Sequence, residues 1–447
     1  MSDTEENGLH AGAACGDITP WLGVTMAGYA SREGGAKEIG DPLHARALVL
    51  KSGDDRLTLV ATDLIGIHRA LADEIRTAIE AEVGIPSSHV MLSATHTHFG
   101  PEVRPSDEPD DASEEKSKAI YGQMLTRRIV DTVRAARDAL LPARIGATKS
   151  TIEGISFNRR TRQPDGQVVM SFRYPEPDAD LTFGPVDTEL RTLRVESPDG
   201  ALIAAVVNFA CHAVCSVDRM NAISADWPGR ASAGVESVLG GVCLCVPGCS
   251  GNIVPRVREG WAKEKIGYSV AGEAIRQLLW TNTTGGARLS ARCEETALPL
   301  KEFGAVAEAE AKVKELEAAA AKAGPDTSTP EDLNNIRGEL AMAKSDLSKA
   351  RKYDGQTEQT TWVQALHIGD IRLVGLPGEI FAEIGMRIKE QATTEHCLVM
   401  SLCNDSVGYV PVGKEYPRGG YEVRSTLFAP GADDVLVEAA LRLAEKE

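Results

Sequence analysis

The stretch that decides the fold is Ser93-Ala94-Thr95-His96-Thr97-His98-Phe99-Gly100-Pro101, which follows the strand-like run His89–Leu92. The preceding text alternates strand-like and helix-like segments, at 43–51, 57–63 and 69–83. This alternation is typical of an α/β fold, in which loops at the carboxyl ends of strands carry functional groups. Residues two apart on a strand share a face, so we expect His96 and His98 to point the same way. The pair indicates either a metal or acid/base site, or two hydrogen-bonded loop residues.

The rest of the chain continues this pattern. A polar, acidic stretch from Pro105 to Lys118 precedes a helical pattern over 119–141, and we expect it to be a surface loop that covers the site. Glu379 follows the turn Pro377-Gly378, which predicts a helix start where the helix dipole favours a charged carboxylate. Further strands are predicted at 203–209, 242–247, 361–368, 371–376 and 398–403, and further helices from 226 and from 379 to about 393. The expected fold class is therefore α/β, with mixed β-sheets and surrounding helices.

Residues 303–324 and 330–355 form a segment of a different kind. Apolar residues recur there at alternating spacings of three and four, which predicts an antiparallel helical hairpin. Thr329 and Pro330 are predicted to cap and begin its second helix. We expect one domain over 1–447 with this hairpin, 303–355, inserted in it. The hairpin is either an arm for homo-oligomerisation or partner binding, or an insertion docked on the surface.

The chain has 447 residues and is acidic, with 48 Lys plus Arg against 65 Asp plus Glu and a formal net charge of −17. This charge opposes binding to polyanions, so we expect neither nucleic acid nor stable membrane association, but a small-molecule substrate. The polar segment 1–7 lacks the features of a secretory signal, which predicts a cytoplasmic protein. The nine cysteines are expected to be reduced, and those between Cys211 and Cys249 to be buried apolar side chains rather than a thiolate zinc site.

Separate segments of the chain offer metal-binding side chains. Taken singly, each has a simpler explanation, because a lone histidine after an apolar strand is usually a hydrogen-bonded core residue. A glutamate after a turn is likewise explained by its place at a helix start. Together the segments offer imidazole, carboxylate and phenol groups: His96 and His98, His212, Glu379, Tyr409 and Tyr421.

In this order the segments resemble the catalytic domain of the neutral ceramidase family. The similarity extends over most of the chain but does not include the helical hairpin. The matching segments are Asp17-Ile18-Thr19-Pro20, Gly28-Tyr29, Ala45-Arg46-Ala47, Asp63, Ala94-Thr95-His96-Thr97-His98, Gly100-Pro101, Asn158-Arg159, His212, Ser224-Ala225-Asp226, Pro377-Gly378-Glu379, Gly408-Tyr409-Val410 and Tyr421-Glu422.

The resemblance implies a zinc ion, Zn2+, held by four side chains: His96, His212, Glu379 and Tyr409. Two imidazoles and a carboxylate suit zinc, whereas tyrosine is an uncommon ligand. The resemblance also implies that His98, Arg159 and Tyr421 line the site and orient or polarise a scissile amide. In the expected scheme, zinc and Tyr421 stabilise the oxyanion, and Arg159 fixes a substrate anion or carbonyl. The general base is then either His98 or Asp226.

One segment departs from the family pattern. The family carries a serine nucleophile in a motif of the type Gly-Asp-x-Ser-Pro-Asn, whereas this chain reads Gly251-Asn252-Ile253-Val254-Pro255-Arg256. Val254 has no nucleophilic atom, so either a metal-activated water attacks, or Ser250 or Cys249 substitutes through a shifted loop. We favour water, because a replacement four or five residues away requires a different backbone path.

The expected function is therefore that of a zinc-dependent hydrolase that cleaves an amide (N-acyl) bond of a small soluble substrate. Ceramide itself is not expected, because a strongly acidic chain with 5% aromatic residues is poorly suited to extracting a lipid from a membrane. One alternative is a metal-dependent hydrolase or lyase acting on an ester, lactone or glycosidic bond. Another is an inactive scaffold with a structural zinc. Against it, a structural zinc needs only four ligands in a closed coordination sphere, and the chain offers more candidate side chains than that.

Overall fold

The computed structural model describes residues 8–29, 31–105, 112–176, 180–322 and 330–445. The amino-terminal part of the chain forms a five-stranded sheet of order β5-β4-β3-β1-β6. Only β4 and β5 run parallel in it, because α1 (Arg69–Val83) connects them. The strands are β1 Leu9–Asp17, β3 His44–Ser52, β4 Asp55–Thr62, β5 Val90–Ala94 and β6 Leu141–Pro142.

Both faces of this sheet are buried, which explains the nearly continuous apolar text of its strands. Val49 of β3 points toward α1 and α2 (Ala112–Asp138), where it joins one apolar core. Its neighbour Leu48 points to the opposite face and joins a second core shared with the other large sheets. The side chains of β3 therefore alternate between two interiors rather than between core and solvent.

Two four-stranded sheets form the second layer of strands, with orders β14-β12-β11-β7 and β16-β17-β18-β20. Leu193, Leu244 and Leu366 from these sheets pack against the first sheet in the shared core. Each sheet is mixed, because β12 and β14 are parallel, as are β18 and β20. The strands are β7 Arg144–Thr151, β11 Glu189–Glu196, β12 Leu202–Phe209, β14 Val242–Pro247, β16 Leu289–Pro299, β17 Glu358–Ile368, β18 Ile371–Gly375 and β20 Cys397–Met400.

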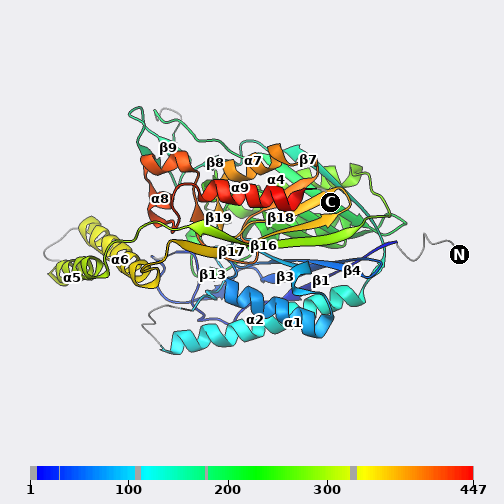
Figure 1. The fold of residues 1–447 in the computed structure, drawn as a ribbon, viewed down its shortest axis with the longest axis horizontal. Coiled ribbons are helices and arrows are strands. Elements are labelled where there is room, and N and C mark those ends of the chain that lie inside the picture. The colour runs from blue at the N-terminus through cyan, green and yellow to red at the C-terminus, as the bar shows by residue number, and fades with distance from the viewer. Residues whose placement is uncertain (1–7, 30, 106–111, 177–179, 323–329, 446–447) are drawn as a thin grey trace.

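Four helices cover the outer faces of these two sheets. Helices α3 (Asp226–Leu239) and α4 (Ala262–Trp280) pack on the first, and α7 (Ala382–Gln391) and α9 (Ala432–Ala444) pack on the second. Two layers of strands therefore lie between two layers of helices (Figure 1). Among the helices of the described ranges, none combines the length and apolar character that crossing a bilayer requires.

Short elements connect these layers, and several of them carry the candidate site. Four two-stranded ribbons pair distant segments, and one of them, β19 with β21, is central to the site. The ribbons are β2 Glu38–Ile39 with β13 Ala222–Ile223, β8 Ser156–Asn158 with β15 Ile253–Pro255, β9 Arg160–Arg162 with β10 Val168–Met170, and β19 Glu379–Ile380 with β21 Tyr409–Val410. The short helices are η1 Ser87–His89, η2 Val217–Arg219, η3 Gly413–Arg418 and α8 Tyr421–Ser425.

Helices α5 (Val306–Lys322) and α6 (Pro330–Lys352) project from one end of the molecule (Figure 1). Their contact is made by a small apolar cluster that includes Leu316 and Leu347. Two ion pairs between them, Glu310 with Arg351 and Glu317 with Lys344, run in opposite order along the two helices, so the helices are antiparallel. The predicted cap Thr329 lies outside the described residues.

The predicted α/β class with mixed sheets and surrounding helices is confirmed. The predicted surface loop from Pro105 to Lys118 is wrong for residues 112–118, which form the first turns of α2. Lys118 pairs with Glu114 and Glu115 at distances of 2.9 and 2.7 Å, and such pairs one turn apart stabilise a helix start rich in polar residues. All nine cysteines are unpaired, and the five between Cys211 and Cys249 are buried, as expected.

Candidate metal and catalytic site

The candidate site forms where three strands end and their loops meet. His96 follows β5, His212 follows β12 and Glu379 follows β18. A parallel backbone bridge between Thr97 and Ala213 joins the first two loops. The three side chains therefore lie at the carboxyl ends of strands, where functional groups are expected in an α/β fold.

The predicted strand placement of His96 and His98 is wrong, because β5 ends at Ala94 and the two histidines follow it in a loop. His96 has a φ of +65°, a conformation that costs energy for a residue with a side chain. This left-handed residue turns the chain so that the rings of His96 and His98 meet edge to face, with centroids 4.9 Å apart. The turn, not strand periodicity, brings the two imidazoles together.

Each of three imidazoles presents its Nδ1 atom to a backbone carbonyl oxygen. A carbonyl oxygen only accepts hydrogen bonds, so the ring proton is on Nδ1, and Nε2 of the neutral ring keeps its lone pair. This arrangement fixes both the tautomer and the direction of each ring. The three bonds join His96 to Ile65 at 2.7 Å, His98 to Gly28 at 3.1 Å, and His212 to Ser250 at 2.7 Å.

The three Nε2 atoms converge beside the Glu379 carboxylate. Glu379 Oε2 lies 3.3 Å from Nε2 of His96 and 3.3 Å from Nε2 of His212. The Nε2 atoms of His96 and His98 are 3.4 Å apart. Lone pairs at this separation repel one another unless a proton or cation lies between them. The donor atoms are therefore arranged for a shared cation, and the three imidazoles form a candidate metal cluster.

The pKa values of these groups favour cation binding. Burial alone raises the pKa of Glu379, but His96 and His212 beside it hold that pKa well below its usual range. Burial, and then Arg159, lower the pKa of His212 to about 4. Burial, followed by the neighbouring imidazoles, lowers the pKa of His98 well below its usual value. Glu379 is therefore ionised, and the neutral forms of His98 and His212 are favoured; these are the forms that bind metal ions.

Gly28 approaches the site so closely that a side chain there meets His98. Its φ is +101°, and a Cβ atom would lie 2.6 Å from His98 Nδ1. We expect Gly28→Ala to displace the His98 ring and to cost about 1–2 kcal/mol of backbone strain. Thermal unfolding and kcat are the measurements. Gly23→Ala is the matched control, because its φ of +88° carries similar strain in open space; equal losses of kcat in both variants would contradict the His98 explanation.

The predicted helix start at Glu379 is wrong. Glu379 lies in β19 and pairs directly with Tyr409 of β21, and the helix begins only at Ala382. The amide of Ala382 donates instead to the side-chain oxygen of Asn252 at 2.9 Å. The parallel ribbon, and not the helix dipole, therefore sets the position of the carboxylate and holds Tyr409 next to it.

Tyr409, Tyr421 and Arg159 line the same site. Arg159 Nη2 donates to the Tyr409 hydroxyl at 3.1 Å, and the rings of Tyr409 and Tyr421 meet edge to face with centroids 5.7 Å apart. Burial, and then the charge of Glu379, raise the pKa values of both tyrosines, so both phenols keep their protons. Tyr421 remains 45% exposed, so part of this residue is open to solvent beside the site.

A buried network of ion pairs supports Arg159, and local sequence patterns do not reveal it. Glu422 is fully buried and accepts from Arg159 Nε at 2.8 Å and from Arg160 Nη1 at 2.9 Å. Arg160 also pairs with Glu415 at 3.0 Å. Arg32 is a second residue that the sequence did not suggest, and its guanidinium donates to the His98 carbonyl at 2.6 Å. These partners are far apart in the chain, so no spacing rule connects them.

Asp226 is not brought into the cluster. It is buried, and its carboxylate accepts from the amides of Cys215 at 2.9 Å and Trp227 at 2.7 Å and from the Ser216 hydroxyl at 3.2 Å. Burial raises its pKa to about 6. Its bonds hold the turn after His212 in place, so of the two candidate bases only His98 lies among the converging side chains.

The segment 251–256, where the resemblance places a serine motif, adjoins the site, because the Ile253 carbonyl accepts from the His212 amide at 3.1 Å. Val254 is buried in β15, opposite Phe157 of β8. Cys249 packs against Gly385 of α7, and burial raises the pKa of its thiol. Ser250 is nearer to the histidine cluster, because its carbonyl oxygen accepts a hydrogen bond from Nδ1 of His212.

Comparisons with known proteins agree over most of the chain. A family model described as neutral/alkaline non-lysosomal ceramidase, N-terminal, matches residues 9–244. The neutral ceramidase of Mycobacterium tuberculosis is 23% identical, over 98% of this chain and 77% of that protein. The neutral ceramidase of Pseudomonas aeruginosa is 24% identical, over 95% and 70%. The crystal structure of neutral ceramidase from P. aeruginosa has the same fold, with a TM-score of 0.72 at 22% identity, covering 98% of this chain and 74% of that one.

Proposed function

Because this chain belongs to the neutral/alkaline non-lysosomal ceramidase family and is therefore a hydrolase, we propose that it is a zinc-dependent amidase. In this proposal it cleaves the N-acyl bond of a small substrate, and water is the nucleophile. The observation that carries the proposal is the convergence of the Nε2 atoms of His96 and His212 on one oxygen of Glu379, at 3.3 Å each.

The spacing of these atoms suits zinc. Ligand atoms about 2.0–2.1 Å from a tetrahedral zinc ion are about 3.3–3.4 Å from one another. The separations of 3.3 Å between imidazole nitrogen and carboxylate oxygen match this value. In the proposal, His96, His212 and Glu379 would hold the ion, and Tyr409, which pairs with Glu379 in the β19–β21 ribbon, would be the fourth ligand. A bound zinc ion supplies Lewis-acid polarisation of the scissile carbonyl and of the attacking water.

The remaining side chains complete the proposed reaction. His98 Nε2 takes a proton from the water while the water oxygen bonds to the carbonyl carbon. The Tyr421 hydroxyl donates a hydrogen bond to the oxyanion that forms. The carbon–nitrogen bond then breaks, and the leaving amine takes the proton from His98. Arg159 holds Tyr409 through Nη2, and its Nη1, which has no hydrogen-bond partner among the described residues, orients the substrate carbonyl.

Three observations favour water over a protein nucleophile. Val254, at the position where the resemblance implies a serine nucleophile, has no reactive atom. Cys249 packs against α7, and its thiol is disfavoured as a thiolate by burial. Ser250 uses its carbonyl to hold His212, and this fixes its backbone as a support for the imidazole.

Metal removal and a serine variant test the proposal together. With an N-octanoyl aminocoumarin as the probe, we expect a chelator to abolish amide hydrolysis and stoichiometric zinc to restore it. We expect Ser250→Ala to retain most of the turnover. Zinc content is measured alongside the rate. Turnover that survives complete metal removal, or that disappears in Ser250→Ala with zinc still bound, would contradict the proposal.

A longer lipid amide, of the kind that the relatives' names indicate, is the second candidate substrate. The exposed rings of Phe172, Tyr174 and Phe183 favour it, because they offer apolar surface. Phe172 also lies under the guanidinium of Arg159, at 5.9 Å, and so lies next to the site. An acyl series from acetyl to palmitoyl separates the two candidates by the chain length at which kcat/KM is greatest.

A further inference from the structure

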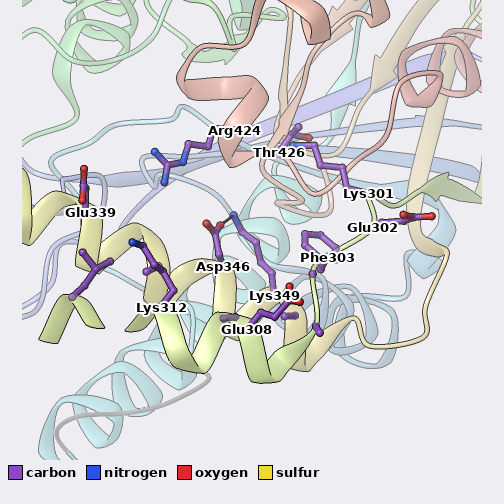
Figure 2. A pocket seen from close by; sticks show the side chains of 16 residues that line it. Lys301, Glu302, Phe303, Glu308, Lys312, Glu339, Asp346, Lys349, Arg424 and Thr426 are labelled. Atoms are coloured by element: carbon purple, nitrogen blue, oxygen red, sulfur yellow. Dashed lines mark ion pairs between the residues drawn. The ribbon is translucent and has the colours of Figure 1, made fainter. Parts of the chain in front are cut away.

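A cavity of about 600 Å3 lies between the helical pair α5–α6 and the short helix α8 (Figure 2). Lys312, Asp346 and Lys349 line it from the helical pair, and Arg424 and Thr426 line it from the other side. Polar contacts that span the cavity can therefore fix the position of α8 relative to the helical pair.

Two lysines contact the end of α8. Lys349 reaches it across the cavity, whereas Lys301 lies on the same side as α8, since its amide donates to the Leu427 carbonyl at 2.8 Å. Lys349 of α6 donates to the Ser425 carbonyl at 3.4 Å, and Lys301, just before α5, donates to the Val423 carbonyl. The last carbonyls of a helix have no partners within it, so these ammonium groups satisfy acceptors that α8 cannot satisfy itself. Burial, and then the nearby Lys349, lower the pKa of Lys301, as expected for two ammonium groups at one helix end.

Helix α8 belongs to the wall of the candidate site. Its first residue, Tyr421, contacts the ring of Tyr409, and its second, Glu422, pairs with Arg159. The residue that follows α8, Thr426, donates to the Tyr409 carbonyl at 2.6 Å. A shift of α8 would therefore move both tyrosines and the support of Arg159 at once.

We propose that Lys301 and Lys349 are positioning residues that anchor α8, Lys349 from the helical pair α5–α6 and Lys301 from the segment before it, and thereby hold Tyr421 and the Arg159–Glu422 pair at the site. In this role the two lysines touch neither substrate nor metal. They act through two carbonyl groups of one short helix. The helical pair, which the family resemblance did not include, is thereby given a function at the site.

The double variant Lys301→Met/Lys349→Met tests this proposal, because methionine keeps an apolar stem of similar length without the ammonium group. Hydrogen exchange is measured on peptides that cover 409–410 and 421–426. We expect the backbone amides there to exchange about tenfold faster than in the wild type, since the hydrogen bonds from the two lysines to the last carbonyls of α8 are lost. Lys312→Met is the matched control: Lys312 lines the same cavity but pairs with Glu315 of its own helix at 3.1 Å.

Turnover of the N-octanoyl probe is the second measurement, and it depends on the proposed amide hydrolysis. We expect kcat of the double variant to fall about tenfold with KM little changed, because a small misplacement of catalytic groups affects the transition state most. Lys301→Arg/Lys349→Arg should restore it. Unchanged exchange, or faster exchange with wild-type kcat, would overturn the proposal. If the wild type hydrolyses no amide, the proposed function fails, and exchange still decides whether the lysines hold α8.

Discussion

Replacing His212 with alanine is expected to remove the metal and to lower kcat/KM by more than about 100-fold, since loss of an outer-shell partner alone costs roughly 10- to 100-fold. His212 is fully buried, and its Nε2 faces Glu379 at 3.3 Å. The substitution also leaves the Ser250 carbonyl without its donor, which costs about 1–3 kcal/mol. Metal content, kcat/KM and the melting temperature are measured on the same preparation.

The three measurements separate a catalytic metal from a structural one. Modest loss of stability with complete loss of turnover indicates catalysis, whereas collapse of the fold on metal loss indicates a structural ion. His367→Ala is the control for loss of a buried imidazole, because His367 bonds to the Leu443 carbonyl at 2.7 Å in another part of the molecule. A His212 variant that keeps both metal and turnover would contradict the proposed site.

Elements whose causes are local were predictable from the sequence. The helix α1 was expected over 69–83, and it begins and ends there, because its apolar spacing is regular and Gly84 ends it in a left-handed conformation with φ +75°. The buried strand β14 was likewise expected at its observed bounds, 242–247. In both cases the pattern is set by residues within one element, and neighbouring elements only supply the apolar surroundings.

Features that depend on distant partners were not predictable in this way. Glu379 follows Pro-Gly and so looked like a helix start, but pairing with Tyr409, thirty positions away in the chain, makes it a strand. From the sequence, Asp226 looked equally suited to be a base, because its three hydrogen bonds, to Cys215, Ser216 and Trp227, form only in the folded chain. The partners of Arg160 are more than 250 positions away, and no periodicity records them.

Replacing Glu422 with glutamine is expected to lower the free energy of unfolding by about 3–5 kcal/mol, because it breaks a buried ion pair on one side only. Glu422 is the carboxylate shared by Arg159 and Arg160, at 2.8 and 2.9 Å, and none of its surface is exposed. The neutral amide leaves the Arg159 guanidinium buried without its carboxylate, while Arg160 keeps Glu415. Urea unfolding of metal-free protein measures the loss without a contribution from ligand binding.

Glu317→Gln is the matched control, because it removes the same charge from an exposed pair with Lys344 at 3.1 Å and should cost no more than about 1 kcal/mol. If both variants lose equally little stability, water or rearranged side chains must compensate for the charge of Arg159. The ion pair with Glu422 would then not be what holds Arg159 in place. If only Glu422→Gln is strongly destabilised, its turnover should fall as well, since the same bond that stabilises the fold directs Arg159 toward Tyr409. Stability and catalysis would then depend on one buried carboxylate.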